Sequence, residues 1–155
     1  RGRSVNRTPV EQDQLVNVLL STPKDVLLVH DQASTTAGDL PVWGTEMKDA
    51  IKQFTGVGGT VVVLATNAGA GEMGTWLANT ELLTVNSMSV MTGEQVANDA
   101  PGDAVGLSVL APFLARPLTV SFDITVDPQH PVATVLSRKT DGAPVAIHRV
   151  VFPDP

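Results

Sequence analysis

The chain has 155 residues, a mass of 16.2 kDa and a formal net charge of −6, which suits one domain of ordinary size. Hydrophobic residues make up 43% of it and charged residues only 17%, which excludes an intrinsically disordered chain, because disorder needs low hydrophobicity and high charge. The absence of cysteine excludes disulfides, thiolate metal ligands and a cysteine nucleophile. The longest apolar runs are far shorter than the ~20 residues of a membrane-spanning helix, so we expect no membrane span.

A short basic arm opens the chain. Residues 1–7 hold three arginines and no acidic residue, whereas residues 8–155 hold seven basic and sixteen acidic residues, a net charge of −9. Nucleic-acid binding needs a basic footprint, and only this arm supplies one, so we expect a solvated arm and no nucleic-acid partner. Because the chain begins with Arg1, we expect a processed product or a piece of a longer chain, with residues 8–155 forming a single α/β domain.

Helices and strands are predicted to alternate through the first half of the chain. Residues 8–11, Thr-Pro-Val-Glu, form a capping box, in which a hydroxyl and a carboxylate satisfy free backbone N–H groups at the start of a helix. The continuous apolar runs at 25–29 and 60–66 favour strands covered on both faces, as in a parallel sheet. Between them, a helix over about 42–55 is predicted from an apolar stripe at i, i+3, i+4 and i+7, formed by Met47, Ala50, Ile51 and Phe54.

A short helix with Met73, Trp76 and Leu77 facing inward follows the second apolar run, and residues 82–85 predict a short strand. The order helix, strand, helix, strand, helix is typical of an α/β unit with right-handed parallel crossovers.

The last third of the chain has a different pattern. Apolar and polar residues alternate over 119–126, which predicts a strand with one buried face. The apolar segments 131–136 and 144–152 flank Asp141-Gly142, which predicts a hairpin. We expect these strands to be antiparallel and to extend one edge of the parallel sheet.

A glycine-rich turn follows the second predicted strand. Gly69, Gly71 and Gly74 match the G-x-G-x-x-G pattern of dinucleotide-binding proteins, between a strand and a helix as that pattern requires. No strand ends in an acidic residue at the distance expected for ribose binding. Two interpretations remain: a tight turn that lets the helix pack on the sheet, or a turn whose backbone N–H groups bind an anion or a nucleotide.

Polar residues follow both predicted parallel strands. His30 and Asp31 end the first strand, and Asn67 and Glu72 follow the second. Ligands bind at the carboxyl ends of strands in open α/β sheets, so His30, Asp31 and Glu72 are candidates for an acid/base group. The chain has no G-x-S-x-G nucleophile elbow, and the alternative is that these residues only cap loops.

The remaining histidines have weaker functional signals. His130 lies in the stiff loop Asp127-Pro-Gln-His-Pro, but the chain has no His-x-His or His-Glu-x-x-His spacing, so we expect no metal site. His148 alternates with apolar residues on a strand, which favours a partly buried, hydrogen-bonded histidine over a catalyst.

The first part of the chain resembles the class I glutamine amidotransferase-like superfamily, including its trehalose-utilisation-type members. The resemblance rests on the strand at 25–31, the glycine-rich helix end at 54–59 and the strand at 60–64. The segment 127–151 is similar to the closing region of such domains, where a His-Pro pair precedes a terminal hairpin. The resemblance implies a three-layer α/β/α fold with a mostly parallel sheet and an antiparallel C-terminal hairpin.

The chain departs from this family in two respects. Asn67-Ala68 stands where amidotransferases carry a cysteine, which excludes glutamine hydrolysis by a thiolate. Such folds also begin with a strand, whereas this chain opens on a helix, so we expect the missing strand to lie upstream or to come from another chain. An unpaired edge in that position is prone to association.

These observations predict a non-catalytic α/β domain that works by binding or assembly, with a protein partner or a second copy and without a cofactor. The lack of cysteine and the many Thr, Ala and Val residues are typical of exported bacterial proteins, which favours a secreted, periplasmic or cell-surface location in a larger protein. The alternatives are a small hydrolase at the edge formed by His30, Asp31, Asn67 and Glu72, and an anion or nucleotide site at 69–74.

Overall fold

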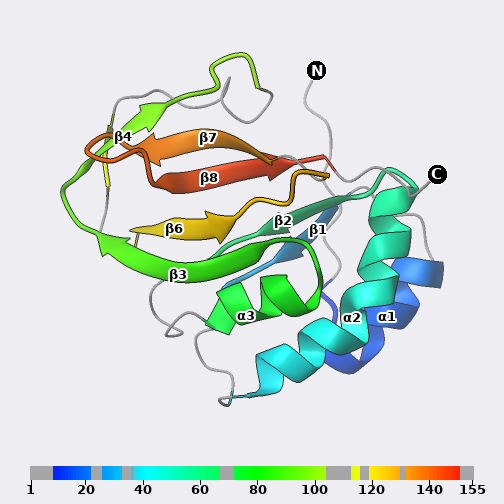
Figure 1. Cartoon of the computed structure of the whole chain (residues 1–155). Helices are drawn as coiled ribbons and strands as arrows, with labels where there is room; N and C mark the ends of the chain where they lie inside the picture. The colour runs from blue at the N-terminus through cyan, green and yellow to red at the C-terminus, as the bar shows by residue number, and fades with distance from the viewer. Residues whose placement is uncertain are drawn as a thin grey trace.

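The computed structural model describes residues 9–21, 26–32, 36, 38–66, 72–103, 113–115, 119–129 and 132–150. Figure 1 shows helices gathered on one side of the strands. In chain order the elements are α1 (Gln12–Ser21), β1 (Val26–Val29), α2 (Asp39–Gly56), β2 (Thr60–Val63), α3 (Glu72–Asn79), β3 (Thr84–Met91), β4 (Gln95–Asn98), β5 (Phe113–Leu114), β6 (Thr119–Thr125), β7 (Val132–Arg138) and β8 (Pro144–Arg149).

The strands form short, mostly antiparallel sheets. Strands β1 and β2 pair in parallel, β3 pairs with β6, and the order β5-β4-β7-β8 forms an antiparallel sheet. Within the described ranges more residues lie in strands than in helices, and most strand pairs are antiparallel, so the prediction of a three-layer α/β/α fold with a mostly parallel sheet is wrong. The two apolar runs do form parallel strands, but β3 and β4 find antiparallel partners far along the chain, in β6 and β7, and local patterns do not specify such partners.

The helices and the parallel strands enclose the first hydrophobic core. The predicted stripe on α2 is confirmed, because Met47, Ala50, Ile51 and Phe54 are all buried. Helix α3 contributes the buried side chains that were predicted for it. One face of β1 and one face of β2 pack on the same cluster. The buried members of this core are Leu40, Met47, Ile51, Met73, Trp76 and Leu77.

The antiparallel strands enclose a second core. Met91, Val96 and Val135 have no exposed surface, and Ala115 and Leu136 pack with them. The hairpin predicted around Asp141-Gly142 is confirmed, since β7 and β8 pair antiparallel across a turn in which Gly142 has a φ of 76°. The expectation that this hairpin extends the parallel sheet is wrong, because β7 pairs with β4 and β8 lies beside β6 (Figure 1).

One face of the β1–β2 pair is uncovered. Val26, Leu28, Val62 and Leu64 point away from the first core and remain 55%, 48%, 39% and 45% exposed. We call these four side chains the open face. The prediction that both strands are covered on both faces is therefore wrong. In the part of the chain that the structure describes, helices pack on only one side of these strands, and the antiparallel strands use their apolar residues in their own core.

Candidate functional site

The predicted polar edge lies at the ends of β1 and β2. The two strands run in parallel with Val29 opposite Val63, so the residues that follow each strand meet at one edge. Thr66 Oγ1 donates a hydrogen bond of 2.5 Å to Asp31 Oδ2. The other oxygen, Asp31 Oδ1, is buried and has no hydrogen-bond partner among the described residues. This geometry places one carboxylate and one hydroxyl together.

The other predicted members of this edge are less well placed for chemistry. His30 is exposed, and its backbone carbonyl accepts a hydrogen bond of 2.8 Å from Gln32 Nε2. Glu72 begins α3, but its side chain lies outside the described residues, as does all of Asn67. An acid/base group made by His30, Asp31, Asn67 and Glu72 therefore stays a prediction.

The glycine-rich turn is described only at its last glycine. Gly69 and Gly71 lie outside the described residues, whereas Gly74 is buried inside α3. A Cβ atom at Gly74 would lie 3.2 Å from the Cβ of Val85 in β3. The small residue therefore lets α3 pack closely on β3, as the tight-turn interpretation requires of this position.

A second histidine, His148, lies beside a carboxylate away from this edge. His148 Nδ1 lies 2.6 Å from Asp103 Oδ2, and 40% of the histidine side chain is exposed, which confirms a partly buried, hydrogen-bonded residue. His130 lies outside the described residues. Within the described part of the chain, no group of three or more histidine and carboxylate side chains is arranged to hold a metal ion.

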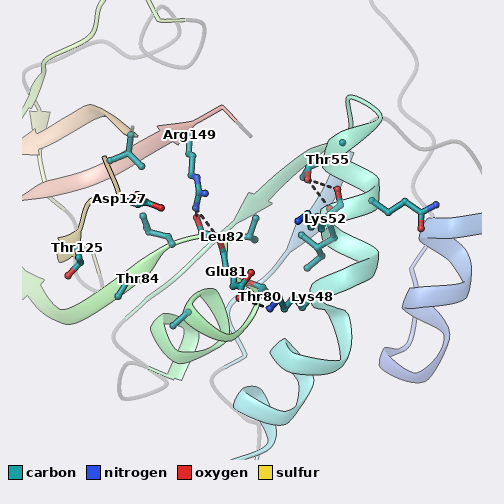
Figure 2. A pocket seen from close by; sticks show the side chains of 16 residues that line it. Lys48, Lys52, Thr55, Thr80, Glu81, Leu82, Thr84, Thr125, Asp127 and Arg149 are labelled. Atoms are coloured by element: carbon teal, nitrogen blue, oxygen red, sulfur yellow. Dashed lines mark hydrogen bonds and ion pairs between the residues drawn. The ribbon is translucent and has the colours of Figure 1, made fainter. Parts of the chain in front are cut away.

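The structure contains a pocket that the sequence did not predict. Its volume is about 620 Å³, within the ~300–1,000 Å³ typical of small-molecule sites. Figure 2 shows side chains from α2, from the segment after α3, and from β8 around it. Its charged lining residues are Lys48, Lys52, Glu81, Asp127 and Arg149. These positions are scattered over a hundred residues of sequence, so no local motif marks them.

Glu81 joins three elements at the wall of this pocket. Lys48 Nζ on α2 donates a hydrogen bond of 2.5 Å to the Glu81 carboxylate. Arg149 at the end of β8 donates through Nη1 to the backbone carbonyls of Glu81, at 3.1 Å, and of Leu82 (Figure 2). These contacts link α2, the end of α3 and β8 around one residue.

Glu81 also adopts an unusual backbone conformation. Its φ is 58°, and no other described non-glycine residue has a positive φ. It follows α3 at the position where the chain leaves the helix, and Leu82 N donates a hydrogen bond of 3.1 Å back to Leu77 O. Glycine is the usual residue at such left-handed helix ends, so the absence of a glycine here removed the signal by which sequence reasoning finds them.

No protein family, curated protein or solved structure matches the chain. The resemblance to the glutamine amidotransferase-like superfamily therefore stays a prediction. Among the described residues, no helix combines the length and apolar character needed to cross a membrane.

Proposed function

We propose that this chain is a non-catalytic assembly domain that associates with a second copy of itself through the open face. The observation that supports this function is a parallel strand pair with one uncovered apolar side, formed by Val26, Leu28, Val62 and Leu64. Parallel strands are almost always covered on both faces, and contiguous exposed apolar surface marks interaction sites.

Two further features of the open face favour a second copy as the partner. Residues 26–29 and 60–66 contain no charged side chain, so two chains of net charge −6 meet there without like charges in contact. Among the described strands, β1 and β2 pair only with each other. Since no other described strand pairs with their outer edges, these edges can pair with the same edge of another chain around a two-fold axis.

The test is the mass in solution as a function of concentration, measured by light scattering. We expect the average mass of the wild-type chain to rise from 16.2 kDa toward twice that value. Leu28→Lys places a charge on the open face and is expected to remain monomeric at every concentration. Leu28 is already 48% exposed, so this substitution leaves both hydrophobic cores intact.

The matched control is Val57→Lys. Val57 follows α2, is 81% exposed and lies outside the open face. We expect this variant to associate like the wild-type chain. A wild-type chain that stays at 16.2 kDa throughout contradicts the proposal, as does equal loss of association in both lysine variants.

A further inference from the structure

We propose that the pocket around Glu81 is a binding site for a small organic oxyanion, a carboxylate or a phosphate ester with an apolar body. The cavity of about 620 Å³ can hold such a molecule. It lies beside α2, α3 and β8 rather than on the open face, so this inference is independent of the proposed assembly.

The charge of the lining favours an anion. The pocket has three cationic side chains, Lys48, Lys52 and Arg149, against two carboxylates, Glu81 and Asp127. Lys48 and Glu81 neutralise each other through their ion pair. By formal charge the lining therefore has one more cation than anion on a chain whose net charge is −6, which is the local polarity that attracts an anion.

Arg149 is held in a conformation suited to oxyanion binding. Its Nη1 is anchored on the carbonyls of Glu81 and Leu82, while Nη2 has no hydrogen-bond partner among the described residues. Its Nε is buried and has no partner there either. A planar guanidinium that is fixed at Nη1 and buried at Nε presents Nη2 at a defined position, from which it can donate a charge-assisted hydrogen bond to an oxyanion.

The strained residue and the apolar wall support the same conclusion. A non-glycine residue with φ of 58° is uncommon, and such outliers concentrate at ligand sites. Here the conformation directs the Glu81 carbonyl to Arg149 and its carboxylate to Lys48. Ile51, Leu83 and Val132 supply apolar surface to the same cavity, which is why we assign an apolar body to the ligand.

The experiment is a titration of the full chain, followed by the backbone amide signals in ¹H–¹⁵N NMR spectra. The probes are benzoate, phenyl phosphate, inorganic phosphate and benzylamine. We expect benzoate or phenyl phosphate to shift signals around Lys52 and Leu82 saturably, and the tighter of the two identifies the oxyanion. Tighter binding of benzylamine, or no saturable shift with either organic anion, overturns the proposal. If inorganic phosphate binds as tightly as phenyl phosphate, the apolar body is refuted.

Variants decide whether binding depends on the pocket cations. Arg149→Gln and Lys52→Met are each expected to weaken binding about tenfold, because each removes a positive charge from the pocket lining. Lys139→Met removes a lysine whose Nζ contacts Gln95 outside the pocket lining, and it is expected to bind like the wild-type chain. If Arg149→Gln does not fold, Lys52→Met decides alone. Undiminished binding in Lys52→Met, or equal weakening in Lys139→Met, overturns the proposal.

Discussion

The contact between α2 and α3 depends on a glycine, which makes Gly44→Ala a test of the packing. Gly44 is buried in α2, and a Cβ atom there would lie 2.8 Å from Asn79 Cβ and 2.9 Å from Trp76 O. Real Cβ atoms essentially never approach other atoms so closely. The Trp76 carbonyl cannot move away cheaply, because it also accepts hydrogen bonds from Thr80 N at 2.9 Å and Thr80 Oγ1 at 3.0 Å.

Two opposing effects set the size of the change. Alanine is favoured over glycine inside a helix by about 0.8–1.0 kcal/mol, whereas overpacking costs about 1–3 kcal/mol. The steric effect wins because both neighbouring atoms belong to the α3 scaffold, so we expect Gly44→Ala to lower the free energy of unfolding by about 1–2 kcal/mol. For a chain of this length, that loss lowers the melting temperature by roughly 2–8 °C.

Gly56→Ala is the matched control. Gly56 ends the same helix, and a Cβ atom there would meet nothing within 4 Å. We expect this variant to be as stable as the wild-type chain or slightly more stable. Thermal unfolding followed by circular dichroism measures both variants. The reasoning is refuted if Gly44→Ala is as stable as the wild-type chain, or if Gly56→Ala loses as much.

Two more substitutions test the antiparallel half of the fold. Arg138 hydrogen-bonds the Asp141 carboxylate and, with a contribution from a backbone N–H, lowers its pKa. The contact therefore stabilises the fold at pH values above 3.8, the ordinary pKa of this carboxyl group. The stabilisation is lost as the pH falls through the depressed pKa. The wild-type chain should be more stable to denaturant than Asp141→Asn at pH 7, and this difference should shrink as the pH falls below 3.8. A difference that stays the same at low pH contradicts this. Met91→Ala empties a site with 0% exposure and should cost about 2–5 kcal/mol in chemical denaturation. Met88→Ala, at a half-buried site on the same strand, should cost less, and the reverse order would contradict the second core.

Sequence patterns predicted the elements whose own residues determine them. The stripe on α2 and the inward residues of α3 follow from helical periodicity, and the β7–β8 hairpin follows from its turn residues. The two strands within residues 84–98 were not predicted, apart from a short strand at their start, because this segment is rich in Ser, Thr and Asn. They form β3 and β4 only by pairing with β6 and with β7 and β5, and such distant partners leave no local trace.

Of the candidate sites, the polar edge could be predicted from the sequence and the pocket could not. Asp31 and Thr66 meet because β1 and β2 are parallel neighbours, an arrangement that both apolar runs suggested. The pocket had no such signal. Its lysines lie on the polar side of α2, Glu81 occupies a position where glycine is usual, and Arg149 ends a strand of the last hairpin. Each of these residues, taken singly, reads as an ordinary surface charge.

The position of the pocket explains why its residues belong to different elements. The first core contains α2, α3 and the parallel strands, whereas the second contains β3, β4, β7 and β8. Arg149 reaches from the second group to the carbonyls that follow α3 in the first. Strand β3 contacts both cores, since Val85 packs on the first and Met91 on the second. The pocket lies along the seam where the two groups of elements meet, and clefts between packed units are preferred ligand sites. Lys52 is exposed and belongs to neither core, so Lys52→Met should weaken binding at this seam while the packing of both cores is kept.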